Sequence, residues 1–156
     1  MYSKIMVPLD GSELAECVLP HVEAFISQCQ IRTIIFVRVV ESIPPAVAGE
    51  YAISMEQLES REAERKSAAE NYLKQVIVRL KSDETKMEAE VMIGRAADRL
   101  SDYAENNDID LILMATHGSS GVSRWIRGSV AERILRAASV PVLMVPAPGT
   151  VGEAKP

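Results

Sequence analysis

Short apolar runs that alternate with segments of helical periodicity constrain the fold of this chain more than any other feature. Several runs are nearly uninterrupted, as expected for strands that are buried on both faces of a sheet. Strands of this kind, each followed by a helix, form a parallel sheet with helices on both sides. The sequence therefore predicts an α/β fold with strands at 4–9 (KIMVPL), 33–40 (TIIFVRVV), 87–94 (MEAEVMIG), 109–115 (IDLILMA) and 140–146 (VPVLMVP).

Between these runs, apolar residues recur every three or four positions, which is typical of amphipathic helices. Helices are predicted over 13–29, from Met55 to about Ser82, over 95–106 and over 130–138. Residues 41–51 are predicted to be a loop, because Pro44 and Pro45 oppose regular structure. The 156 residues suffice for one core. We expect one domain over 1–147 and a loose Pro/Gly-rich tail over 148–156.

The loops that follow the strands are the candidate ligand-binding segments, because open parallel sheets bind ligands beyond the carboxyl ends of their strands. The longest, 115–130 (ATHGSSGVSRWIRGSV), is rich in glycine and hydroxyl side chains. Ser129, with Glu132 three residues later, predicts a capping box on the helix that follows. Gly128 would let a ligand approach the backbone closely. The free N–H groups of that first turn favour a bound anion.

Composition narrows the classes of function. The formal net charge is −5, which argues against nucleic acid or an anionic membrane as the main partner. No apolar run approaches the roughly 20 residues that span a bilayer, and no signal peptide is visible before the first strand. Cys17 and Cys29 fall in one predicted helix, about 18 Å apart, too far for a disulfide. A cytoplasmic protein with reduced cysteines is predicted.

Well-known catalytic and phosphate-binding motifs are missing from the sequence. The loop at 115–130 contains no lysine and no P-loop pattern, and PLDGS follows the first strand in place of a G-x-G-x-x-G. GSSG does not have the spacing of a nucleophile elbow. With His21 and His117 as the two histidines, no cluster has metal-ligand spacing. We therefore predict no catalytic residue and no resident metal.

Two long segments resemble the universal stress protein family. They are DLILMATHGSSGVSRWIRGSVAERILRAASVPVLMVP near the end and KIMVPLDGSELAECVLPHVEAF at the start. The resemblance implies a Rossmann-like, adenine nucleotide alpha hydrolase-like fold, with strand order 3-2-1-4-5. In nucleotide-binding members the loop carries G-x2-G-x9-G-[ST] and wraps ATP. Here Gly118, Gly128 and Ser129 match the second and third glycines and the hydroxyl, whereas Ala115 replaces the first glycine.

The resemblance also implies roles for other positions. Asp10 would lie near the ribose and base, or near Mg²⁺ on the phosphates, and the backbone of Val39 would read adenine. Pro8 and Met114 would form apolar walls of the base pocket. The complete expected nucleotide site comprises Pro8, Leu9, Asp10, Val39, Met114, Ala115, His117, Gly118, Gly128, Ser129 and Val130. If Ala115 required a positive φ, its side chain would cost roughly 1–2 kcal/mol; with a negative φ it would be tolerated.

Family resemblance further implies a homodimer that pairs the last strands, Pro141 to Val145, in antiparallel fashion. An apolar edge strand of this kind needs covering. The leading hypothesis is a stress-response regulatory protein that binds ATP or AMP and is not an enzyme. The first alternative is a member that has lost nucleotide binding through Ala115 and acts by protein–protein contacts. The second is a slow ATPase in which Asp10 holds Mg²⁺.

Overall fold

The computed structural model describes residues 2–42, 44–50, 52–116 and 129–148. A sheet of five parallel strands organises the fold, and the strands follow the order β3-β2-β1-β4-β5. The predicted α/β class, parallel sheet and strand order are confirmed. The strands are β1 (Lys4–Pro8), β2 (Thr33–Val40), β3 (Lys86–Ile93), β4 (Leu111–Ala115) and β5 (Val142–Val145).

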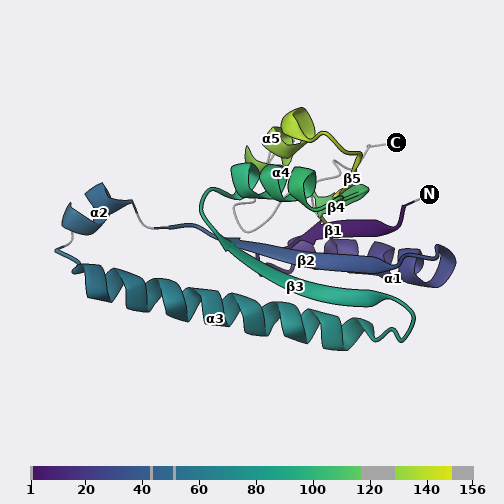
Figure 1. Cartoon of the computed structure of the whole chain (residues 1–156), viewed down its shortest axis with the longest axis horizontal. Coiled ribbons are helices and arrows are strands. Elements are labelled where there is room, and N and C mark those ends of the chain that lie inside the picture. Colours follow the sequence, from purple (N-terminus) through teal and green to yellow (C-terminus); the bar gives the residue numbers. More distant parts are fainter. Residues whose placement is uncertain (1, 43, 51, 117–128, 149–156) are drawn as a thin grey trace, which may run out of the picture.

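Helices cover both faces of the sheet (Figure 1). One core cluster joins the sheet to α1 and α3, and the other joins it to α4 and α5. Side chains alternate between these cores along each strand. In β1, for example, Ile5 and Val7 enter the α1/α3 core while Met6 enters the α4/α5 core. The helices are the 3-10 turn η1 (Ala15–Val18), α1 (Leu19–Gln28), α2 (Pro45–Glu50), α3 (Met55–Leu80), α4 (Ala96–Asn106) and α5 (Ser129–Ala137).

Two predictions for the first half of the chain were wrong. The segment predicted as a loop at 41–51 contains the short helix α2. Proline is tolerated in the first turn of a helix, and Pro45 occupies the first position of α2. The predicted helix over 13–29 is instead a 3-10 turn followed by α1. Pro20 lies in the first turn of α1, where its missing N–H breaks no helical hydrogen bond.

The buried residues of the long charged helix α3 all lie in its second half. Ser54 caps it with a complete capping box, in which the side chains of Ser54 and Gln57 each bond the other residue's backbone N–H. Its buried residues are Ala69, Leu73, Val76 and Leu80, so fourteen residues from Met55 to Ala68 precede the first of them. With α2, this first part extends beyond the end of the sheet (Figure 1).

The prediction that both cysteines lie in one helix was wrong. Cys17 lies in η1 and Cys29 is the C-cap of α1. Both are free thiols, which agrees with the prediction that they do not pair. Within the described ranges, no helix is long and apolar enough to cross a membrane.

Candidate functional site

The sheet opens between β1 and β4 at its carboxyl edge. The pairing of these strands covers Ile5 with Leu111 and Met6 with Ile112, and goes no further in the described strands. On either side the ladders continue, β1 with β2 to Pro8 and β4 with β5 to Ala115. Strand order reverses here, because the chain runs from β1 outward to β3 and then returns to β4. This is where open α/β sheets bind ligands.

Pro8 supplies a physical reason for the opening. Lys4 C=O accepts a hydrogen bond from Asp110 N–H on the β4 side, and Leu9 N–H donates to Val37 C=O on the β2 side, both at 2.9 Å. Alternate residues of a strand direct their backbone groups to opposite neighbours, so Pro8 faces β4. Proline has no N–H and cannot continue that ladder.

Asp10 follows Leu9 at this opening, in a tight turn. Its Oδ1 atom accepts hydrogen bonds from the backbone N–H and the hydroxyl of Ser12, at 2.9 Å and 2.6 Å. Gly11 adopts a φ of +88°, which favours glycine. The Ser12 hydroxyl oxygen in turn accepts a hydrogen bond from the N–H of Ala15, the first residue of η1, at 3.1 Å. Asp10 is exposed, so its carboxylate lies at the surface of the carboxyl edge.

Val39 brings backbone polar groups to the same edge. Val37 C=O faces β1, because it accepts from Leu9, whereas Val40 C=O faces β3, because it accepts from Gly94 N–H at 3.0 Å. By alternation, the N–H and C=O of Val39 face the β1 side, beyond the last β1–β2 hydrogen bond. The side chain of Val39 packs against the α4/α5 core.

The structure settles which backbone conformation Ala115 requires. Ala115 lies in β4, and in the described part of the chain the non-glycine residues with positive φ are Ala52, Lys81 and Asp108. Its methyl group is buried in the α1/α3 core, where Leu9 also lies. Replacement of the family's glycine therefore imposes no left-handed strain here. The side chain of Met114 is buried in the α4/α5 core.

Two of the remaining predicted site residues lie at the start of α5. Ser129 is the first residue of α5, and Val130 packs against the α4/α5 core. The side chain of Ser129 falls outside the described residues, so its capping box with Glu132 stays a prediction. His117, Gly118 and Gly128 also lie outside the described residues. Among those described, no group of three or more His, Cys, Asp or Glu side chains could hold a metal ion.

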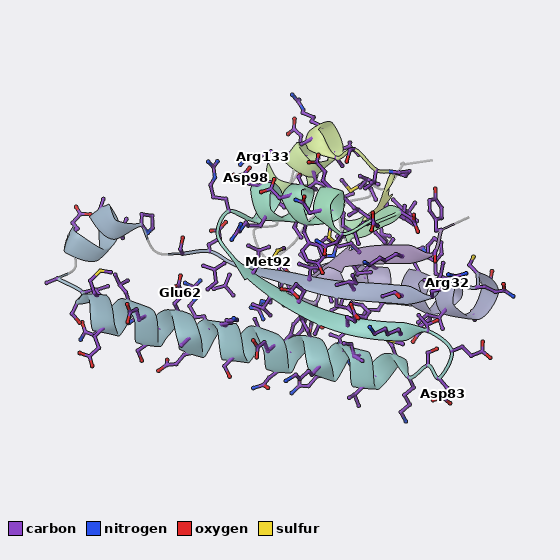
Figure 2. All side chains as sticks on the ribbon, viewed as in Figure 1. Arg32, Glu62, Asp83, Met92, Asp98 and Arg133 are labelled. Carbon is purple, nitrogen blue, oxygen red and sulfur yellow. The ribbon has the colours of Figure 1, made fainter. Side chains whose placement is uncertain are left out.

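An ion-pair cluster ties α5 to α4 near this edge. Asp98, in the first turn of α4, accepts from Arg133 of α5 at 2.8 Å and pairs with Arg95 at 3.4 Å. Figure 2 shows Asp98 and Arg133 side by side. These side chains are about half exposed or more, so each pair contributes only about 0.2–1 kcal/mol.

Sequence reasoning missed two residues at this edge. Thr116 continues the β4–β5 pairing, because its N–H donates to Val145 C=O at 2.9 Å and its hydroxyl oxygen accepts from Ala147 N–H at 3.3 Å. Arg38 interrupts the apolar run of β2 and stacks over the ring of Tyr72, 5.3 Å from its centroid. A charge within an otherwise apolar strand was the signal available for Arg38.

Comparison with known proteins identifies the family. The model of the universal stress protein family matches residues 1–146. The chain belongs to this family. It is 29% identical over 150 residues to the universal stress protein MJ0531 of Methanocaldococcus jannaschii, covering 95% of this chain and 84% of that protein. The solved structure of MJ0577 from the same organism is 26% identical, with a TM-score of 0.79 over 94% of this chain and 96% of that one.

More distant universal stress proteins share the fold. A structure in complex with cAMP is 20% identical, with a TM-score of 0.63 over 94% of this chain and 98% of that one. A structure of an Arabidopsis thaliana member with AMP bound is 16% identical, with a TM-score of 0.62 over 94% of this chain and 93% of that one. At these identities the likeness shows the fold alone.

Proposed function

We propose that this universal stress protein binds an adenine nucleotide, ATP or AMP, at the carboxyl edge between β1 and β4, as a regulatory module and not as a catalyst. The observation that carries the proposal is the opening of the sheet at the reversal of strand order, with Asp10 beside it. Family members solved with cAMP and AMP support the same class of ligand.

The described residues suit the parts of a nucleotide. Asp10 presents an exposed carboxylate that can accept hydrogen bonds from ribose hydroxyls or hold Mg²⁺ on the phosphates. Val39 directs a backbone donor and acceptor toward the β1 side, as recognition of an adenine edge requires. Pro8 and Met114 supply apolar surface, and the first turn of α5 at Ser129 and Val130 offers N–H groups to a phosphate.

A comparison of binding free energies shows that these groups must act together. One helix N-terminus contributes about 0.3–1 kcal/mol, whereas micromolar binding requires about 8 kcal/mol. We therefore propose that residues of the loop after β4, with Gly118 and Gly128 at the positions that match the family pattern, complete the phosphate site. His117 is proposed to belong to the same loop site.

Asp10→Ala is expected to weaken binding of ATP and AMP by about 10–100-fold, because hydrogen bonds to a charged acceptor contribute about 1.5–3 kcal/mol. Isothermal titration of the purified, untagged protein with each nucleotide, with and without Mg²⁺, measures the effect. Asp83→Ala is the matched control, because Asp83 precedes β3 at the amino edge of the sheet, whereas Asp10 follows β1 at the carboxyl edge. Figure 2 shows Asp83 far from Met92, which lies near the carboxyl end of β3.

Nucleotide that copurifies with the wild-type protein should be identified first. The protein is denatured, and the released ligand is identified by chromatography and mass spectrometry. If no nucleotide is released, and none binds up to millimolar concentration, nucleotide binding is excluded and the protein–protein alternative takes its place. Steady phosphate release from ATP that disappears in Asp10→Ala would instead identify a slow ATPase.

Ala115→Gly is expected to leave nucleotide affinity within about twofold of wild type, because Ala115 has no strain to relieve. It should lower the free energy of unfolding by about 1–2 kcal/mol, through greater backbone entropy and a lost buried methyl. Ala52→Gly is the contrasting control: Ala52 has a φ of +51°, so glycine there should not destabilise the protein. Urea unfolding measures both. A tenfold gain in affinity for Ala115→Gly would contradict this interpretation.

We also propose a homodimer formed through β5. The two edges of the sheet differ in chemistry. β3 carries Lys86, Glu88 and Glu90, and charged side chains discourage pairing at an edge. β5 reads VLMV, and Leu143 is 40% exposed. Antiparallel pairing of two copies over Pro141 to Val145 would satisfy the free edge and cover Leu143.

A further inference from the structure

The guanidinium of Arg38 contacts both a tyrosine ring and a glycine. It lies over the ring of Tyr72 of α3, 5.3 Å from the ring centroid. It also lies against Gly11, where a Cβ atom would be 3.0 Å from Cζ and Nη1 of Arg38 and 3.1 Å from Nη2. Three nearly equal distances mean that the flat face of the guanidinium packs against Gly11. A side chain at position 11 would displace it.

Stacking is the interaction that holds Arg38 in place. No hydrogen bond or ion pair joins its N–H groups to another residue within the described ranges. Arg38 is half-buried on the same side of β2 as Phe36. A guanidinium over a tyrosine ring is attracted by the negative face of the ring. Its planar face is therefore the part of Arg38 that matters, and methionine would not reproduce it.

Tyr72 is itself held in place by the segment that follows the Asp10 turn. Its hydroxyl donates to Oε1 of Glu16 at 2.9 Å, and Arg79 donates to Oε2 of Glu16 at 2.9 Å. Burial, followed by the neighbouring Glu16 carboxylate, raises the pKa of Tyr72 well above its ordinary value. Tyr72 therefore stays protonated at neutral pH and keeps its hydrogen bond.

A backbone hydrogen bond connects Glu16 to the turn that presents Asp10. Glu16 N–H donates to Ser12 C=O at 3.3 Å. The turn from Asp10 to Ser12 is thus packed against Arg38 at Gly11 and bonded to Glu16 at Ser12. The direction of the Asp10 carboxylate depends on this turn, because Asp10 Oδ1 is bonded to both the N–H and the hydroxyl of Ser12.

We propose that Arg38 is a positioning residue for Asp10: by packing against both Tyr72 and Gly11 it fixes the Asp10–Ser12 turn, and so increases nucleotide affinity without touching the ligand. This inference rests on the proposed function, because Asp10 is the group through which Arg38 acts.

A double-mutant cycle tests the coupling. Arg38→Met keeps the length of the side chain and removes the planar cation. In the wild-type background it is expected to weaken ATP binding by about tenfold, because residues linked through one backbone turn do not act independently. In the Asp10→Ala background the same change is expected to weaken binding by less than about twofold. Arg32→Met, at the opposite end of the sheet (Figure 2), is the matched control and should change neither.

Equal weakening by Arg38→Met in both backgrounds would overturn the proposal, because Arg38 would then act independently of Asp10. No weakening in either background would also overturn it. A purely structural role would lower stability equally in both and leave no coupling in affinity.

A measurement on the ligand-free protein separates this proposal from the proposed function. Hydrogen exchange of the Ser12 amide reports the bond to Asp10 Oδ1 whether or not nucleotide binds. Faster exchange in Arg38→Met, with no change in Arg32→Met, would support the positioning of the turn. Unchanged exchange would overturn it. Failure of the wild type to bind any nucleotide, with faster exchange in Arg38→Met, would reject the proposed function alone.

Discussion

Phe36→Ala is expected to lower the free energy of unfolding by about 3–5 kcal/mol, the range for truncating a fully buried phenylalanine. Phe36 is 0% exposed, in the second strand from the edge of the sheet, and packs in the α1/α3 core. Neighbours on both strands and in the helices prevent the site from collapsing around the vacated volume. Typical domains have a total stability of only 5–15 kcal/mol, so this change removes a large share.

Urea unfolding followed by circular dichroism measures the effect of Phe36→Ala. Val78→Ala is the control: Val78 is 67% exposed on α3 and should change stability by less than about 0.5 kcal/mol. A loss below about 1 kcal/mol for Phe36→Ala would mean that the core repacks, contrary to the close packing on which the expectation rests.

Leu143→Lys is expected to convert the proposed dimer into a monomer. Leu143 is 40% exposed at the centre of the β5 edge. Across a two-fold axis the substitution places two like charges in one interface, which is how natural edge strands avoid pairing. Size-exclusion chromatography with light scattering measures the mass of each species.

Val78→Lys is the matched control for the dimer, because it adds the same charge to an exposed apolar position on α3. Its mass should equal that of the wild type. A wild-type protein that is monomeric at micromolar concentration would contradict the proposed interface, as would a Leu143→Lys protein that remains dimeric.

Several elements could be predicted from sequence because local pattern decides them. β2 was predicted at its observed bounds, since an apolar run rich in β-branched residues has few alternatives to a buried strand. α3 was predicted from its helical periodicity and begins at the predicted Met55, where the structure shows a capping box formed by Ser54 and Gln57. The sequence pattern gave a wrong prediction at α2, where two prolines indicated a loop but Pro45 begins a helix.

The candidate site likewise contains residues that the sequence could predict and contacts that it could not. Asp10 was predicted from its place after an apolar run and from the family resemblance, whereas Arg38 and Tyr72 were not connected to it. They lie 34 residues apart in the chain (72 − 38) and meet only because α3 packs across β2. No local pattern can reveal such a contact, since it depends on how a helix is placed against the sheet.

The sequence by itself determined the alternation of strands and helices, and with it the parallel sheet, because period and residue type act locally along the chain. Only the tertiary structure decided that Pro8 faces β4, that the sheet opens there, and that Ala115 lies in a strand with its methyl in the core. These outcomes depend on which strands become neighbours and in what register. Hydrogen bonds between segments distant in sequence determine that register, and their partners cannot be read from one segment alone.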